Sequence, residues 1–292
     1  MTLKVGYACV NTQLPSPART IRLANATPQR LRELVAHNLD ALEAILDWNA
    51  EHGIEVFRLT SNLVPFASHP VNELVWWVEF DERFRALGEQ LRTAGARISI
   101  HPAQYVVLSS RTPTVVTAAV DELTYHGRLL DALGHRRSAK IVLHVGAGTS
   151  GDASALERFA AGVVRLPENV RTRLAIENDE RWPVERVLDL SARLGVPVVL
   201  DVFHHSLAPS FRGLGVRELV QLVGQTWAAE DGRQEVHFST QADGRRPGAH
   251  AETLDLAAFA RFVECVGDLP LDCILEVKDK EQSVLRAQEL LS

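Results

Sequence analysis

Nine side chains of the kind that bind metal ions fall at, or just beyond, the ends of predicted β-strands. Six stand at strand ends and three follow in adjoining segments, and the full set is His69, His101, His144, Glu177, Asp201, His204, His237, His250 and Glu276. Imidazole nitrogens and carboxylate oxygens, with no thiolate among them, suit Zn²⁺ or Mn²⁺. Because nine donors exceed the needs of one ion, the sequence predicts a cluster of two or three divalent ions.

The central place of Glu177 in this series makes it the candidate for a carboxylate that bridges two ions. Ions that share a bridging ligand lower the pKa of a water between them and hold the attacking and leaving oxygens of a phosphoryl transfer. The set therefore favours hydrolysis of a phosphodiester. Taken singly, each histidine is better explained as a hydrogen-bonded polar residue, so the prediction depends on their joint placement.

The other histidines do not follow this pattern. Four of them fall in or beside helical segments and are expected to be solvated or at helix ends: His37, His52, His126 and His135. His204 and His205 are adjacent and point in different directions, and His204 is favoured as the ligand.

These positions require a fold that brings many strand ends together. The predicted strands are 3–9, 54–59, 97–101, 139–145, 173–177, 197–202, 234–239 and 271–277, and the predicted helices are 28–51, 71–93, 113–133, 153–164, 183–194, 216–228, 254–266 and 280–291. Strict alternation of this kind is typical of an α/β TIM (β/α)8 barrel, here expected as a single domain over 1–292. An open doubly wound sheet is the alternative, but it usually has five or six strands and a glycine-rich first turn, which this chain lacks.

The long connections all follow strands rather than helices, at 10–26, 60–70, 202–215 and 240–253. In a TIM barrel the carboxyl ends of the strands form the catalytic face. We therefore expect the site at this face. His101 would end one strand there, and Pro102 would direct the following loop outward.

Composition restricts the partners and the compartment. The 292 residues carry a net charge of −6, which argues only weakly against nucleic acid because bound divalent cations reverse the local sign. Cys9, Cys265 and Cys273 have no metal-like or redox spacing and are expected to be reduced thiols. Residues 1–5 contain no signal-peptide core, and no apolar run approaches about 20 residues. We expect a cytoplasmic monomer with no membrane partner and no nucleotide cofactor.

Several motifs, in chain order, resemble those of the UV damage endonuclease family. They are Gly6-Tyr7 with Asn11, Arg58-Leu59-Thr60-Ser61-Asn62-Leu63-Val64-Pro65, Ser68-His69-Pro70, His101-Pro102-Ala103-Gln104-Tyr105, His144-Val145-Gly146, Glu177-Asn178-Asp179-Glu180, Asp201-Val202-Phe203-His204-His205, His237-Phe238-Ser239 and Glu276-Val277-Lys278-Asp279-Lys280. The match runs from the first predicted strand to the last. The Gln-Tyr pair that follows His101 is not a generic feature of metal-binding barrels.

The resemblance implies a barrel of the endonuclease IV type with a divalent metal cluster, often including Mn²⁺, held by the nine side chains named above. It implies incision of damaged double-stranded DNA immediately 5′ to cyclobutane dimers and (6-4) photoproducts, leaving a 3′-hydroxyl and a 5′-phosphate. It also implies that Gln104 and Tyr105, with Tyr7 and Asn11, probe the duplex. A damaged base pair that already stacks poorly costs less free energy to open.

Basic residues on the loops of the catalytic face are candidates for contacts with DNA phosphates. Arg245 and Arg246 are the preferred pair, and the others are Arg19, Arg22, Arg111, Arg212, Lys278 and Lys280. Lys278 follows Glu276 by two residues, so we expect it near the metals, where it would stabilise the cleaved phosphate.

One position departs from the family pattern. Some relatives have a lysine, which can be carboxylated, two residues before the histidine of the seventh strand, and this chain has Glu235 there. Residues 235 and 237 point to the same side of a strand, so Glu235 is expected to face the barrel interior. Its shorter side chain is expected to reach the metals through water, which would change metal count or preference.

Three other functions remain as alternatives at this point. An abasic-site endonuclease of the endonuclease IV type would share the barrel and the metals but not the probing residues. A metal-dependent sugar isomerase would need a closed pocket, and the outward Gln104-Tyr105 pair and the long loops argue against it. A scaffold without catalytic activity is disfavoured, because nine converging ligands exceed structural need.

Overall fold

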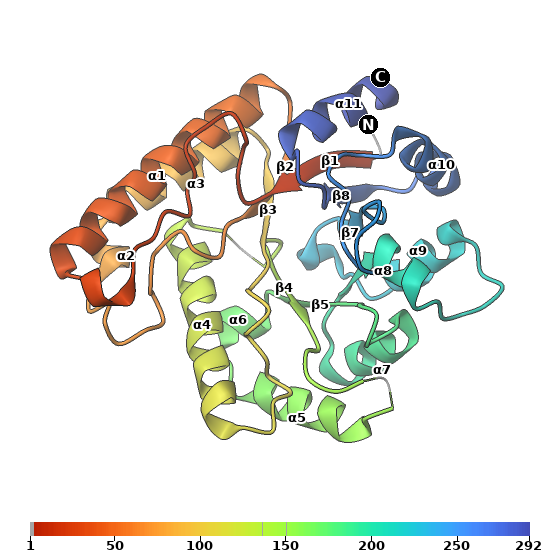
Figure 1. The fold of residues 1–292 in the computed structure, drawn as a ribbon, viewed down its shortest axis with the longest axis horizontal. Coiled ribbons are helices and arrows are strands. Elements are labelled where there is room, and N and C mark those ends of the chain that lie inside the picture. Colours follow the sequence, from red (N-terminus) through yellow and green to blue (C-terminus); the bar gives the residue numbers. More distant parts are fainter. Residues whose placement is uncertain (1–2, 136, 150) are drawn as a thin grey trace.

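The computed structural model describes residues 3–135, 137–149 and 151–292, so Met1 and Thr2 of the expected domain lie outside the described residues. Within these ranges, parallel strands form a closed barrel in chain order (Figure 1). They are β1 (Leu3–Ala8), β2 (Val56–Leu59), β3 (Arg97–Ile100), β4 (Lys140–His144), β5 (Leu174–Glu177), β6 (Val198–Asp201), β7 (Gln234–Phe238) and β8 (Leu271–Leu275). Pairing of β8 with β1 closes the barrel, which confirms the predicted TIM fold.

Helices connect the strands and surround the barrel (Figure 1). They are α1 (Pro28–Glu51), α2 (Trp76–Glu79), α3 (Asp81–Thr93), α4 (Pro113–Ala132), α5 (Ala153–Val164), α6 (Glu168–Arg171), α7 (Val184–Leu194), α8 (Val202–Leu207), α9 (Val216–Gly224), α10 (Leu256–Val266) and α11 (Glu281–Leu291), with 3-10 turns at Leu23–Asn25 and Ala229–Asp231. Helix α1 begins where expected, because the Thr27 side chain accepts a hydrogen bond from the Arg30 N–H at 3.3 Å. In the described ranges, no helix has the length and apolar character needed to cross a membrane.

Successive residues of a strand face different environments. Tyr7 and Phe57 belong to the large apolar core between the barrel and the helices, whereas Ala8, Val56 and Ile274 form a small cluster inside the barrel. This alternation follows from the two-residue period of a strand. Side chains on the inner set of positions therefore decide what the two mouths of the barrel contain.

The amino-terminal mouth contains paired charges. The Asp272 carboxylate accepts hydrogen bonds from Arg97 at 3.1 Å and from Arg233 at 2.8 Å. Asp231 pairs with Lys140 and also accepts a hydrogen bond from Arg137 Nε at 2.7 Å. The two carboxylates and Lys140 are buried. Each buried charge at this mouth thus has an opposite charge beside it, as a structural ion network requires.

Two predicted elements differ from the structure. The segment 71–93 is not one helix, because α2 and α3 are separated at Phe80 and residues 71–75 are irregular. There the Asn72 side chain donates to Pro65 O at 2.8 Å and accepts from the Leu74 N–H at 3.1 Å. The segment 202–215 is not all loop, since α8 follows β6 directly. Asp201 caps α8 by accepting a hydrogen bond from the His204 N–H at 2.7 Å.

Candidate metal centre and substrate groove

Side chains from three neighbouring strands form the first group of potential ligands. His101 directly follows β3, and His144 and Glu177 are the last residues of β4 and β5. One donor atom of each lies within 4.8 Å of the others. His101 Nε2 is 2.9 Å from Glu177 Oε2, and His101 Nδ1 is 3.0 Å from Pro102 O. Donation from Nδ1 to that carbonyl would leave the Nε2 lone pair free for a cation.

A second group shares Glu177 with the first. Its members are Glu177, Asp201, His237 and Glu276, whose donor atoms again all lie within 4.8 Å of one another. Glu177 Oε1 is 2.6 Å from His237 Nδ1, whereas Glu177 Oε2 faces His101. The two oxygens of one buried carboxylate therefore serve different groups, which is the arrangement expected of a bridging ligand.

The charges around Glu177 determine its protonation. Burial alone would raise the pKa of this carboxyl group, but the neighbouring His237 and His144 hold the pKa well below its ordinary value. Burial alone would lower the pKa of His237, but the charge of Glu177 raises that pKa to about 10. Glu177 is thus an anion at neutral pH, as a metal ligand must be.

Asp201 provides a direct test of whether these residues fit a metal ion. Burial raises the pKa of its carboxyl group to about 7. Its Oδ1 accepts the His204 N–H, whereas Oδ2 has no hydrogen-bond partner among the described residues. A buried acceptor without a donor costs free energy unless a cation or another ligand compensates it. Three converging carboxylates and one imidazole form a hard donor set, which fits a divalent ion.

Arg58 on β2 also belongs to this site, although the sequence analysis assigned no role to it. It is buried, and its Nη1 is 2.6 Å from Glu276 Oε1. Burial alone would raise the pKa of Glu276, but Arg58 and His237 lower it. The sequence feature that could have identified Arg58 as a site residue is a charge inside an otherwise apolar strand, Val56-Phe57-Arg58-Leu59.

The remaining predicted ligands lie outside both compact groups. The His250 Nε2 atom is 3.5 Å from Glu276 Oε2, and the rings of His204 and His250 are 5.3 Å apart, so both border the second group. His204 Nδ1 is 3.2 Å from Glu180 Oε1, a contact that the sequence did not suggest. His69 is exposed, and its Nδ1 accepts a hydrogen bond from the Val71 N–H at 3.0 Å. Only Nε2 of His69 remains available to a metal.

A polar groove of about 540 Å³ adjoins the first group. Its lining includes His101, His144 and His204 together with Gln104 and Arg246. Tyr105 follows Gln104 on the outward loop and is 62% exposed. The groove therefore brings predicted metal ligands, one predicted probing residue and one predicted phosphate contact to a single surface.

The loop that carries Arg245 and Arg246 is held by its own backbone hydrogen bonds and by the Gln241 side chain. Gln241 donates from Nε2 to Ala242 O and Arg246 O, both at 3.0 Å, and its Oε1 accepts from the Gly248 N–H at 3.0 Å. A single antiparallel bridge also joins Gln241 to His250. These bonds fix the loop between the groove and the second group.

The structure places Tyr7 and Asn11, two of the predicted DNA-probing residues, in the interior of the protein. Tyr7 has no exposed surface, and its hydroxyl donates to Asn49 Oδ1 of α1 at 2.7 Å. Asn11 is also buried, and its Nδ2 donates to the Tyr7 hydroxyl at 3.3 Å. The physical reason is strand alternation: Ala8 faces the barrel interior, so Tyr7 faces the helices. Both side chains support the loop after β1 from the protein interior.

Lys278 and Glu235 make contacts that the sequence did not predict. The Lys278 side chain is exposed and pairs with Glu252, so it does not reach toward the two ligand groups. Glu235 faces the interior as predicted, but it belongs to neither ligand group. Its Oε1 accepts a hydrogen bond from Ser99 Oγ at 2.9 Å and lies 3.1 Å from His237 Nε2. Glu235 therefore stands behind a potential ligand rather than among the ligands.

One of the histidines outside the predicted cluster differs from expectation. His126 of α4 is fully buried rather than solvated or at a helix end, and burial lowers its pKa to about 3. It lies on the face of α4 that packs onto the core, beside Tyr125, with 4.8 Å between ring centroids. A helical pattern alone did not reveal that this histidine lies on the inner face.

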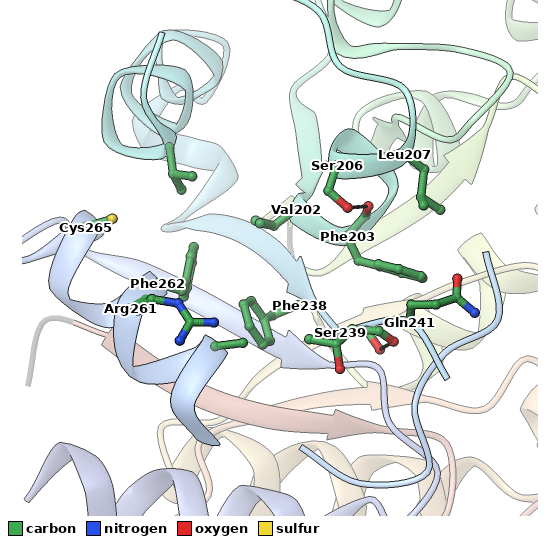
Figure 2. A pocket seen from close by; sticks show the side chains of 13 residues that line it. Val202, Phe203, Ser206, Leu207, Phe238, Ser239, Gln241, Arg261, Phe262 and Cys265 are labelled. Carbon is green, nitrogen blue, oxygen red and sulfur yellow. Dashed lines mark hydrogen bonds between the residues drawn. The ribbon is translucent and has the colours of Figure 1, made fainter. Parts of the chain in front are cut away.

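A second cavity, of about 340 Å³, is lined by residues of α8, of α10 and of the end of β7 (Figure 2). Its wall is largely apolar, with Phe203, Phe238 and Phe262 around it. None of the nine predicted metal ligands is among its described lining residues. The Phe203 ring, whose centroid is 5.3 Å from that of His250, borders the cavity. The polar groove, rather than this apolar cavity, is the candidate active site.

Comparison with known proteins agrees with this geometry. The family model described as UV-endonuclease UvdE matches residues 3–292. A UV DNA damage endonuclease of Clostridium perfringens is 34% identical over 290 residues, which cover 97% of this chain and 69% of that protein. The crystal structure of SacUVDE aligns with a TM-score of 0.92 and 38% identity, covering 99% of this chain and 98% of that one.

More distant structures share the fold alone. An AP endonuclease of family 2 from Brucella melitensis aligns with a TM-score of 0.52 at 12% identity, covering 98% of each chain. At this identity the alignment shows a shared fold. The match over residues 3–292 does identify the family, and the chain belongs to the UV-endonuclease UvdE family.

Proposed function

We propose that this protein is a metal-dependent endonuclease that incises double-stranded DNA immediately 5′ to UV photoproducts, both cyclobutane dimers and (6-4) photoproducts. The products would be a 3′-hydroxyl and a 5′-phosphate. Family membership supports the role in UV damage. The observation that carries the chemistry is the shared carboxylate of Glu177, whose two oxygens face two separate groups of potential ligands beside one groove.

The two groups would hold two or three divalent ions, Mn²⁺, Zn²⁺ or both. His101, His144 and Glu177 form one site, and Glu177, Asp201, His237 and Glu276 form the other. His69, His204 and His250 are the proposed additional ligands. When bound, such ions supply an activated water and stabilise the negative charge on the phosphate. Arg58 offsets part of the negative charge of the carboxylates through its contact with Glu276.

The chain's own groups would select and orient the DNA. Gln104 and Tyr105 project from the loop after β3, where the amide and the ring can replace the stacking that a lesion disrupts. Arg246 lines the groove, and Arg245 is its neighbour on the same loop, which supports the proposal that both contact phosphates. We further propose that residues 1–292 act as one domain, as a monomer in the cytoplasm.

The first experiment measures nicking of supercoiled plasmid, with and without UV irradiation, in the presence of Mn²⁺ or a chelator. We expect nicking only of irradiated DNA with Mn²⁺, and product ends that a polymerase extends without treatment because they carry a 3′-hydroxyl. Equal nicking of both plasmids would contradict damage specificity. Full activity after exhaustive chelation would contradict metal dependence.

An abasic-site endonuclease is the second candidate, and the same assay distinguishes it. Depurinated plasmid replaces irradiated plasmid, and cleavage of the depurinated plasmid alone would favour this alternative. A Tyr105→Ala variant tests recognition separately from cleavage. We expect incision of irradiated DNA to fall about tenfold or more, since stacking of a base on an aromatic ring is worth about 1–3 kcal/mol, while bound metal stays unchanged. Parallel loss of both would show that Tyr105 is structural.

A further inference from the structure

The two ring nitrogens of His237 face different partners. Nδ1 lies toward the ligand groups, 2.6 Å from Glu177 Oε1 and 3.5 Å from Glu276 Oε1. Nε2 lies toward the opposite side, 2.8 Å from Arg58 Nη2 and 3.1 Å from Glu235 Oε1. His237 itself is fully buried, so bulk water does not reach either nitrogen.

Arg58 and Glu235 make opposite demands on Nε2. A guanidinium only donates hydrogen bonds, so the Arg58 contact requires a lone pair on Nε2. A carboxylate only accepts, so the Glu235 contact requires a proton on Nε2. A neutral imidazole carries one proton, and the form with the proton on Nε2 is the one that leaves the Nδ1 lone pair free. The two neighbours therefore favour opposite tautomers of the ring.

We propose that Glu235 is a positioning residue that holds His237 in the tautomer with the proton on Nε2, so that Nδ1 presents its lone pair to a divalent cation. Arg58 stabilises the other tautomer, in which Nδ1–H donates to Glu177 and Nε2 accepts from Arg58. A cation at Nδ1 would take the place of the proton that Nδ1 otherwise shares with Glu177, and the ring would then keep one proton, which Glu235 holds on Nε2. This inference rests on the metal binding proposed above.

The surroundings of Glu235 fit this role. Its side chain is fully buried, and the hydrogen bond from Ser99 Oγ at 2.9 Å fixes the oxygen that faces Nε2. The other oxygen, Oε2, has no hydrogen-bond partner among the residues described, so the carboxylate keeps acceptor capacity. A carboxylate behind a metal-binding histidine fixes the tautomer and increases the basicity of the ligand.

The test compares Mn²⁺ binding in two variants of Glu235. Glu235→Leu removes the acceptor, and we expect Mn²⁺ affinity to fall about 10- to 100-fold, as is typical when such a partner is lost. Glu235→Gln keeps an oxygen that can accept the Nε2 proton, so we expect affinity within a few-fold of the unmodified protein. The electron paramagnetic resonance signal of free Mn²⁺ reports binding without an activity assay.

A buried carboxylate elsewhere in the barrel provides the matched control. Asp272 pairs in register with Glu235 across β7 and β8, and its partners are Arg97 and Arg233 rather than His237. We expect Asp272→Leu and Asp272→Asn to leave the Mn²⁺ affinity of the folded protein unchanged. Unchanged affinity in Glu235→Leu would overturn the proposal. Equal losses in Glu235→Leu and Glu235→Gln would also overturn it, since charge balance against Arg58 would then explain the effect.

A spectroscopic measurement on the unmodified protein covers the case in which the variants do not fold. Protein labelled with ¹⁵N-histidine and loaded with Zn²⁺ should show His237 with a protonated Nε2 and a metal-bound Nδ1, assigned by loss of the signal in His237→Gln. A protonated Nδ1 in the loaded protein would contradict the inference. Failure of the unmodified protein to bind Mn²⁺ or Zn²⁺ would instead refute the proposed metal dependence, together with everything that rests on it.

Discussion

The barrel has buried charged side chains at both mouths, and the two sets differ in how their charges are matched. At the amino-terminal mouth, Asp231 and Asp272 each contact two cationic side chains. At the carboxyl-terminal mouth, the carboxylates of the ligand groups are Glu177, Asp201 and Glu276, and Arg58 is the one arginine or lysine that the described ion pairs place among them.

The difference separates a structural network from a binding site. Buried ion pairs that are fully matched contribute to holding the strands together, and removal of one partner is strongly destabilising. Buried carboxylates that converge without enough cations are unfavourable on their own, and they persist where a ligand compensates them. The unpaired Oδ2 of Asp201 is the clearest instance at the carboxyl-terminal mouth.

The largest expected effect concerns the carboxyl-terminal mouth, where buried carboxylates outnumber cationic side chains. Glu177→Gln removes the charge of the carboxylate that both ligand groups share. We expect incision of irradiated plasmid to fall by about 10³-fold or more, because electrostatic stabilisation of the transition state depends on the bound ions. The free energy of unfolding without metal should also decrease, since His237 loses the buried carboxylate whose charge raises its pKa. Retention of normal incision would show that Glu177 does not bridge ions.

The next effect concerns the amino-terminal mouth, where each buried carboxylate has cationic partners. Asp231→Ala leaves Lys140 buried without its counter-ion, and we expect the free energy of unfolding to fall by about 3–5 kcal/mol in urea denaturation. Asp268→Ala is the control, because the Asp268 pair with Arg217 is exposed and its loss should change the free energy of unfolding little. Per folded molecule, Mn²⁺ affinity should stay unchanged in both. A loss of Mn²⁺ affinity in Asp231→Ala would mean that the two mouths are not independent.

His126, a buried histidine away from the ligand groups, makes the stability of the protein depend on pH. Burial lowers the pKa of His126 to about 3, whereas an unfolded histidine has a pKa of about 6.5. The folded state therefore keeps the ring neutral, and this contribution to stability is complete above pH 6.5 and declines as the pH falls toward 3. At pH 5 the loss should be about 2 kcal/mol. In urea denaturation at pH 7 and pH 5, the free energy of unfolding should decline less in His126→Leu than in the unmodified protein. An identical decline in both would contradict the view that His126 is buried in its neutral form.

The smallest effect concerns Lys278. Because this side chain is exposed and pairs with Glu252, we expect Lys278→Ala to change incision less than about threefold and the free energy of unfolding by less than about 1 kcal/mol. Initial rates of nicking under saturating Mn²⁺ measure the first quantity. A loss of about 100-fold, the size seen when a group that stabilises the transition state is removed, would restore Lys278 to the site.

The sequence predicted the barrel and most of the ligand positions for the same physical reason. Parallel strands joined by helices place their carboxyl ends on one face, so the residue that ends each strand is also a residue of the site. Glu177, Asp201 and His144 are each the last residue of a strand, as expected. Strand order and alternation were sufficient to bring them together.

Side-chain direction was harder to predict. Tyr7 was assigned to DNA by family resemblance, but one position along β1 decides between the interior and the helix-facing core. Lys278 follows β8, where the chain leaves the strand and the two-residue period no longer applies. Arg58 escaped notice because its role depends on Glu276 and His237, which lie more than 170 residues away in sequence. Contacts of this kind arise only when the barrel closes.

The hydrogen bonds of the Gln241 side chain have a consequence for the thermodynamics of association. They fix the loop that carries Arg245, Arg246 and His250 before any duplex arrives. A loop that is already ordered loses little conformational entropy on binding, and each backbone residue that must be ordered costs about 1–2 kcal/mol. The arginines can then contribute their full phosphate attraction to affinity, and a change at Gln241 would weaken DNA binding without removing a single charge.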